Sequence, residues 1–354
     1  MEDRLYDYID RIEELDRSMF EGFKMRMDSL TKPRGSLGRL EDLAIQVCMI
    51  RGEQDPSIEN RQVFVMAGDS GVVKEGVSAY PQEVTPQMIY NFLNGGAAIN
   101  AIARATGFKV NVVDVGIISD IETDDLNFHN MKIGRGTKNF REESAMTEEQ
   151  AINAIIAGID IVMRKNGEKP LDLIATGDMG IGNTTPSSAI VSAITQIPAK
   201  NVTGYGTGVD DEGFERKVRV IEESLEMHSP DPEDALDVLS KVGSFEIGAI
   251  AGAILAGGIL KIPVIVDGFI SQAGALIACT LKPEVVGYII PSHQSFERGS
   301  SAVWRHLGLR PYLYLDMRLG EGTGALLMTN LIESALRVFN EMATFEGAGV
   351  SDKK

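Results

Sequence analysis

Short apolar runs alternate with amphipathic stretches along most of the chain. Between the runs, apolar residues recur at the three- and four-residue spacing of a helix, most clearly from Ile152 to Met163. Strands that alternate with helices form parallel sheets with right-handed crossovers. We therefore predict an α/β fold with a doubly wound, mostly parallel six-stranded sheet and helices on both faces. The expected strands are 63–67, 109–117, 171–175, 262–266, 285–290 and 312–317.

A glycine-rich turn follows the last expected strand. The segment Leu319-Gly-Glu-Gly-Thr-Gly324 leads directly into helix-forming residues from Ala325. Ligands of α/β proteins bind at the carboxyl ends of strands. Glu321 stands there between two glycines, which carry no side chain that would shield it. The turn thus presents a carboxylate to a ligand or, in the simpler alternative, Glu321 caps the next helix.

Two further glycine-rich turns precede helices. In residues 176–186, Thr185 and Pro186 suit the N-cap and first position of a helix, whose N-terminus favours phosphate. Neither the Walker spacing nor GxGxxG is present, so the ATP and dinucleotide fingerprints are missing. Residues 203–208 precede a helix with a basic cluster that includes Lys217. Tight turns without a ligand, and a solvated charged helix face, are the alternatives.

Other boundaries follow from capping residues and loop composition. The long loop 72–84 is of a kind that is commonly functional, and Thr85 is expected to cap a helix that runs to Thr106. Ser295 is expected to cap a helix that ends at His306. Residues 120–143 are polar and irregular, and Thr147-Glu-Glu-Gln150 has the capping-box pattern of a helix start.

Composition narrows the class of partner. The 354 residues are 44% hydrophobic, which is ample for a core, and carry a formal net charge of −17. So acidic a chain is unsuited to nucleic acid or to an anionic membrane surface, and an anionic substrate needs a local positive site. The stretch 247–260 is too short to span a bilayer, and residues 1–30 look helical rather than like a signal peptide.

Metal and disulfide chemistry are not expected. Only Cys48 and Cys279 occur, both in apolar surroundings, which indicates core residues in a reducing compartment. The four histidines are scattered and no HExxH motif is present, so we expect no metal site. The predicted location is cytoplasmic.

Several long motifs in one order resemble a known family over nearly the whole chain. They are Lys32-Pro-Arg-Gly-Ser-Leu-Gly-Arg-Leu40, residues 71–85, Gly95-Gly-Ala-Ala-Ile-Asn100, Gly180-Ile-Gly-Asn-Thr-Thr185, Pro263-Val-Ile-Val-Asp-Gly-Phe269 and Leu319-Gly-Glu-Gly-Thr-Gly-Ala325. The chain resembles the nicotinate-nucleotide–dimethylbenzimidazole phosphoribosyltransferases, which make the nucleotide loop of cobalamin.

The resemblance implies a reaction, an assembly and a domain division. Nicotinate mononucleotide would transfer its ribose 5-phosphate to 5,6-dimethylbenzimidazole with anomeric inversion, giving α-ribazole 5′-phosphate and nicotinate, without a cofactor. A homodimer is implied. A small helical domain of residues 1–60, joined by 335–354, would accompany an α/β catalytic domain of residues 61–334; the polar segment at 53–60 suits that boundary.

The resemblance also assigns site residues. Glu321 would be the catalytic base, and Asp178 takes the position of an acidic residue that is commonly Glu in the family, so its side chain is about one bond shorter here. Lys217 matches a lysine at the nucleotide site. Phosphate or ribose contacts would come from Gly180, Gly182, Asn183, Thr184, Gly206, Gly208, Ser295 and Gly324. The aromatic-base pocket would be lined by Ser78, Tyr80, Gln87 and Leu319.

The chain departs from the family pattern at two motifs. It has Asp69-Ser-Gly71 where relatives often read Asp-His-Gly, and Gly243-Ser-Phe-Glu246 where they often read Gly-Gly-Phe-Glu. Neither change removes the base or the phosphate turns. Two alternatives stay open at this point: transfer to another acceptor, such as adenine or a phenol, and a nucleotide-binding protein without catalysis.

Overall fold

A six-stranded sheet forms the centre of the computed structural model, which describes residues 2–351. The strand order is β3-β2-β1-β4-β5-β6, and every neighbouring pair is parallel. This confirms the predicted fold class. The strands are β1 (Arg61–Gly68), β2 (Lys109–Gly116), β3 (Phe128–Asn130), β4 (Leu173–Met179), β5 (Val264–Val266) and β6 (Ile289–Pro291).

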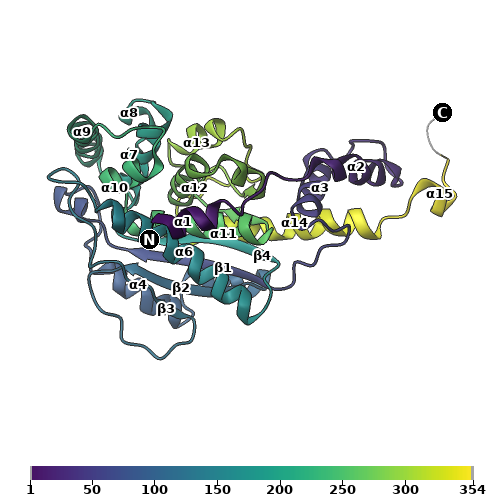
Figure 1. The fold of residues 1–354 in the computed structure, drawn as a ribbon, viewed down its shortest axis with the longest axis horizontal. Coiled ribbons are helices and arrows are strands. Elements are labelled where there is room, and N and C mark those ends of the chain that lie inside the picture. The colour runs from purple at the N-terminus through teal and green to yellow at the C-terminus, as the bar shows by residue number, and fades with distance from the viewer. Residues whose placement is uncertain (1, 352–354) are drawn as a thin grey trace.

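Helices cover both faces of the sheet (Figure 1). They are α1 (Glu2–Ile9), α2 (Phe20–Ser29), α3 (Arg39–Arg51), α4 (Val84–Leu93), α5 (Ala98–Thr106), α6 (Glu148–Glu168), α7 (Thr184–Thr195), α8 (Ala199–Val202), α9 (Asp211–His228), α10 (Ala235–Val242), α11 (Phe245–Leu260), α12 (Phe269–Leu281), α13 (Ser300–His306), α14 (Thr323–Glu341) and α15 (Phe345–Ala348). None of the helices within residues 2–351 combines the length and apolar character needed to cross a bilayer.

The central strand β1 divides the core in two. Phe64 and Met66 belong to the cluster that α6, α7, α10, α11 and α12 complete. Val63 and Val65, which point to the opposite face, belong to the cluster formed with α2, α3, α4, α5 and α14. Successive side chains of a strand alternate between faces, so one continuous apolar run supplies both clusters.

The two ends of the chain meet away from the sheet. Helices α2 and α3 lie beside the C-terminal part of α14 (Figure 1). The rings of Phe23 and Phe339 meet edge to face at 6.1 Å, and Arg26 donates to the carbonyl oxygen of Asn340 at 3.2 Å. Helix α1 packs instead on α6, where Arg4 pairs with Asp160. The domain boundary at residue 60 stays a prediction.

The expected strand at 312–317 is wrong. This segment is extended, but the one bridge that it makes within the described chain joins Leu313 to His293, and Asp316 adopts a left-handed φ of 53°. Both Tyr312 and Leu313 donate to the carbonyl oxygen of Ser292, which breaks the regular register of a ladder. The sixth strand of the sheet is β3, which lies within the segment expected to be irregular.

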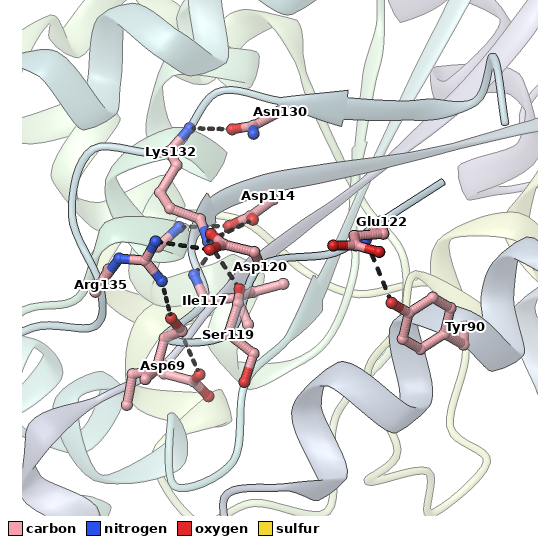
Figure 2. Close-up of polar contacts among 12 residues, drawn as sticks. Asp69, Tyr90, Asp114, Ile117, Ser119, Asp120, Glu122, Asn130, Lys132 and Arg135 are labelled. Atoms are coloured by element: carbon pink, nitrogen blue, oxygen red, sulfur yellow. Dashed lines mark hydrogen bonds and ion pairs between the residues drawn. The ribbon is translucent and has the colours of Figure 1, made fainter. Parts of the chain in front are cut away.

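Charged side chains hold the segment 120–143, which contains β3, against the sheet. Lys132 lies 3.3 Å from Asp114, at the end of β2, and 3.3 Å from Asp120. Arg135 pairs with Asp120 at 2.7 Å, and the Tyr90 hydroxyl accepts a hydrogen bond from the backbone of Glu122 (Figure 2). The polar composition that suggested an irregular loop therefore supplies the ion pairs that hold this segment against the sheet.

Three predicted helix starts are misplaced. Thr85 lies inside α4, and the helix expected to reach Thr106 is broken near Gly95 (φ 74°), where α4 ends and α5 follows. Thr185 lies inside α7, whose N-cap is Asn183. Ser295 precedes α13 by five residues, and Gly299 is its N-cap. In each case a backbone turn, which residue type alone does not reveal, sets the start.

Two other predicted positions lie closer to the observed ones. Residues 283–288 form a 3-10 helix, so the strand expected at 285–290 is displaced to β6. The capping box is confirmed, because the Thr147 hydroxyl accepts from the N–H of Gln150 and the Gln150 side chain accepts from the N–H of Thr147.

Helices α6 and α11 approach so closely that glycine is required at their contact. A Cβ on Gly158 would overlap the carbonyl oxygen of Ala249, and one on Gly252 would overlap that of Ile155. Neither neighbour is a flexible side chain, so the helices themselves would have to separate. The packing of α11 on α6 thus depends on these two residues.

We predict that Gly158→Ala lowers the free energy of unfolding by roughly 1–3 kcal/mol, because the added methyl group overpacks a backbone contact. Gly167→Ala is the matched control on the same helix. A Cβ there meets nothing of the described chain within 4 Å, and we expect no loss of stability, since alanine favours helix. Urea unfolding of the three proteins measures the difference. Equal stability of Gly158→Ala and the parent would contradict the close contact.

Candidate active site

A cavity of about 490 Å³ opens at the carboxyl ends of β4, β5 and β6. Its size suits a small-molecule ligand. The wall is formed by the turn after β4, the glycine-rich turn before α9, the residues after β5 and β6, and the segment that precedes α14. The lining includes Tyr80, Val84, Met88, Asp178, Gly180, Asn183, Thr184, Gly206, Gly268, His293, Ser295, Glu297, Arg318, Leu319 and Glu321.

Glu321 lies on the wall of this cavity. Its side chain is 6% exposed, and its Oε2 accepts a hydrogen bond of 3.1 Å from the N–H of Ile99, at the start of α5. Burial raises the pKa of the Glu321 carboxyl, and the Ile99 N–H opposes that shift. The alternative of a cap for the following helix does not hold, because the N-cap of α14 is Gly322, which has no side chain.

The buried carboxylate of Asp267 fixes the turn that carries Glu321. Its Oδ2 accepts from the N–H of Gly322 at 3.0 Å, and its Oδ1 accepts from the N–H of Ala325 at 2.9 Å. Asp267 follows β5 directly, so these two bonds tie the turn to the end of that strand. Sequence reasoning missed this contact; a polar residue just after a buried strand was the available signal.

A second carboxyl group faces the same turn. Asp178 is the penultimate residue of β4 and accepts from Asn183 Nδ2 at 3.0 Å, while its other oxygen has no hydrogen-bond partner among the described residues. That oxygen lies against Gly320, where a Cβ would meet it at 2.8 Å. Burial raises the pKa of Asp178 to about 7, and the charges of Asp267 and Glu321 add to the shift.

Positive groups gather at the end of the cavity formed by Thr184 and Gly206, where Arg318 lines the wall and Lys217 lies buried behind it. Lys217 is completely buried, and its Nζ donates to Thr184 Oγ1 at 2.8 Å and to the carbonyl oxygen of Gly204 at 3.3 Å. Arg318 donates to the carbonyl oxygen of Gly206 at 3.0 Å. Burial lowers the pKa of Lys217 to about 8, and the Glu297 charge opposes the shift. This end is suited to an anion.

Apolar side chains form the mouth near Glu321. Tyr80, Val84 and Met88 come from the loop before α4 and from α4 itself, and Leu319 comes from the turn. Tyr80 and Leu319 remain more than half exposed. A flat heteroaromatic ring is the kind of ligand that such a surface binds.

The structure separates some predicted site residues from the cavity wall. Ser78 accepts a hydrogen bond from the N–H of Tyr80, Gly182 packs against Val73, and a Cβ on Gly324 would overlap the ring of His293. These three shape the surrounding loops. Those absent from the wall are Ser78, Gln87, Gly182, Gly208, Lys217 and Gly324.

Among the wall residues that sequence reasoning missed are Gly268, His293, Glu297 and Arg318. Three of them follow β5 and β6, at the sheet edge where ligands are expected, so strand position was an available signal. Within residues 2–351, no group of three or more His, Cys, Asp or Glu side chains is arranged to hold a metal ion.

Known proteins are similar to this chain over nearly its whole length. The phosphoribosyltransferase family profile matches residues 12–350. The nicotinate-nucleotide–dimethylbenzimidazole phosphoribosyltransferase of Chloroflexus aurantiacus is 50% identical and covers 99% of both chains. That of Roseiflexus castenholzii is 52% identical and covers 99% of this chain and 98% of its own. The crystal structure of CobT from Thermus thermophilus is 43% identical, with a TM-score of 0.91 over 95% of this chain and all of its own.

Against Gly68, at the end of β1, Glu246 is completely buried. Ser244 Oγ donates to its Oε1, and its Oε2 has no partner within residues 2–351. Burial raises the pKa of Glu246 to about 8 from an ordinary value of 4.5. The folded protein therefore holds this proton more tightly than the unfolded chain does. This preference contributes its full stability below pH 4.5, and the contribution disappears as the pH rises through about 8.

We accordingly predict that Glu246→Gln, which cannot ionise, gains stability relative to the parent as the pH rises from about 5 to about 8. The relative gain should be on the order of a few kcal/mol. Glu341→Gln, at an exposed position, is the control and should follow the parent at every pH. Urea unfolding across this pH range measures the difference. A difference between Glu246→Gln and the parent that is constant with pH would refute the buried neutral acid.

Proposed function

This chain belongs to the phosphoribosyltransferase family, and from that premise we propose that it transfers the ribose 5-phosphate of nicotinate mononucleotide to 5,6-dimethylbenzimidazole. The products are α-ribazole 5′-phosphate and nicotinate, as required for the lower ligand of cobalamin. One observation carries this proposal: the Glu321 carboxylate lies on a cavity of about 490 Å³ that joins an apolar mouth to an end beside Lys217 and Arg318. Two ring systems and a phosphate have room there.

Glu321 is the proposed catalytic base. One nitrogen of the benzimidazole attacks C1 of the ribose while the bond from C1 to the nicotinate nitrogen breaks, and that electron pair leaves with the neutral nicotinate ring. The proton on the other benzimidazole nitrogen passes to Glu321. Burial raises the pKa of this carboxyl and so makes the carboxylate a stronger base. The leaving group is a pyridinium, which departs without an acid.

Asp178 is the proposed partner of the ribose. Positive charge develops on the sugar ring as the bond to nicotinate breaks, and a nearby carboxylate stabilises such charge. Asp178 has a shorter side chain than the Glu that is common at this position, and we propose that it acts on the ribose through its charge. Its second oxygen, which accepts from no described residue and faces Gly320 and the turn of Glu321, supports this role.

We assign the phosphate to the positive end of the cavity. Thr184 lies in the first turn of α7, and Lys217 and Arg318 supply charge beside the Gly204–Gly208 turn. Together with a helix N-terminus, such groups hold a phosphate within an otherwise acidic protein. Gly180, Asn183 and Ser295 line the space between the phosphate and the ribose, whereas Gly182, Gly208 and Gly324 shape the turns.

The acceptor base is assigned to the mouth. Tyr80, Met88 and Leu319 offer apolar surface to the ring within reach of the Glu321 turn. Ser78 accepts from the N–H of Tyr80 and so supports this surface, and Gln87, one residue before Met88, is proposed to flank it. We also propose that the protein is a cytoplasmic homodimer, as the family resemblance implies; both cysteines are free and buried, which suits a reducing compartment.

An acceptor panel tests the proposed reaction. We expect release of nicotinate from nicotinate mononucleotide only when an acceptor is added, and dimethylbenzimidazole to be used faster than adenine or a phenol. Chromatography against an authentic α-linked nucleotide identifies the product. Binding of the mononucleotide without acceptor-dependent release would support a non-catalytic nucleotide-binding protein. Faster use of adenine or of a phenol would mean that the natural acceptor is that compound and not dimethylbenzimidazole.

For Glu321→Gln, we predict a fall in kcat of about 10²–10⁴-fold, because the neutral amide cannot accept the proton. The Kd for nicotinate mononucleotide should change little, since the amide oxygen still accepts from Ile99. Glu341→Gln is again the exposed control. Turnover close to that of the parent would remove Glu321 from the role of base.

A further inference from the structure

An acidic side chain occupies the positive end of the cavity. Glu297 is only 7% exposed and lines the cavity wall. Its Oε2 has no hydrogen-bond partner in the described part of the chain, and it lies so close to the Cα of Gly204 that a Cβ there would overlap it. The carboxylate therefore rests directly on the glycine-rich turn before α9.

The groups around this carboxylate are those assigned to the phosphate. Lys217 Nζ lies against the same turn, 3.3 Å from the Gly204 carbonyl oxygen and 3.2 Å from a Cβ placed on Gly206. Burial raises the pKa of Glu297, and the charges of Lys217 and Arg318, with the Gly206 N–H, oppose the shift. Positive groups of the turn thus already face a negative group of the protein itself.

The backbone places Glu297 in a short bend rather than in a helix or strand. Its N–H donates to Ser295 Oγ at 3.3 Å, and α13 begins only at Ser300. The neighbouring Arg298 lies over the rings of Tyr205 and Phe214, which holds the bend beside the turn. The side chain of Glu297 can therefore leave the turn without disrupting a regular element.

We propose that Glu297 is an internal substitute for the substrate phosphate, which occupies the anion-binding turn in the free enzyme and is displaced when nicotinate mononucleotide binds. This inference rests on the proposed function, which places the phosphate at Lys217 and Gly206. A buried carboxylate and a phosphate cannot share one small site, because like charges repel strongly there. Glu297 thus prevents occupation of the turn by ordinary anions and reduces the affinity for every phosphate-bearing ligand.

Calorimetric titration of Glu297→Gln with nicotinate mononucleotide tests the proposal. We expect the Kd to fall about tenfold, the size of effect that a close charge pair commonly has on binding, and the inhibition constant of inorganic phosphate to fall in parallel. The affinity for dimethylbenzimidazole, which has no phosphate, should not change. Titrations below neutral pH favour protonated Lys217, whose pKa is about 8 in the parent and is lowered further when the Glu297 charge is removed.

Glu215→Gln is the matched control, since it removes the same charge from the exposed face of α9, where Glu215 pairs with Lys200. Its affinities should equal those of the parent. Glu297→Asp keeps the charge but shortens the side chain, and an intermediate affinity is expected; it also serves if the glutamine variant folds poorly. Unchanged or weaker binding of the mononucleotide and of phosphate by folded Glu297→Gln would overturn the proposal, as would equally tighter binding of dimethylbenzimidazole.

Different results would refute the proposed reaction and the proposed role of Glu297. Absence of acceptor-dependent nicotinate release in the parent would remove the proposed reaction but leave the titrations with phosphate and the mononucleotide valid. Normal turnover together with unchanged affinities in Glu297→Gln would remove only the role given to Glu297.

Discussion

The two hydrogen bonds from the Gly322 and Ala325 backbone to the Asp267 carboxylate fix the turn on which the geometry of this site depends. They join the end of β5 to a turn in which Gly320, Glu321 and Gly322 all have a positive φ, of 87°, 64° and 97°. A glutamate in the left-handed region costs roughly 1–2 kcal/mol. The surrounding contacts must supply that energy, and Asp267, buried beneath the turn, provides the most direct of them.

Burial shifts the pKa values of the acidic and basic groups of the site in opposite directions. Asp178 and Glu321 share one end with Asp267, and for all three burial raises the pKa. Lys217, at the other end, has a lowered pKa for the same reason. Removal from water thus favours the neutral forms at both ends and brings the pKa values of these groups nearer to neutral pH, where they can exchange protons. The net charge of −17 has little part in this local arrangement.

The sequence predicted elements wherever a local pattern decides the structure. The apolar run of β1 and the capping box at Thr147 are such cases, and the glycines around Glu321 indicated its place on a cavity. The residues 312–317 show the limit, because their apolar composition suits a strand but pairing depends on the distant Ser292. For Asp267 and Glu297, a position just after a strand indicated the sheet edge, but the turn that each contacts belongs to another part of the chain, and spacing within a sequence does not record such contacts.

Helix α14 connects the turn of Glu321 mechanically to the helices at the two ends of the chain. It begins at the turn of Glu321, has 19 residues and is about 28 Å long, and Phe339 meets Phe23 near its far end. A helix of this length behaves as a stiff rod. A movement of α2 and α3 is therefore transmitted along this single element to the turn before α14, so that packing between the two ends of the chain helps to set where the Glu321 carboxylate lies on the cavity wall.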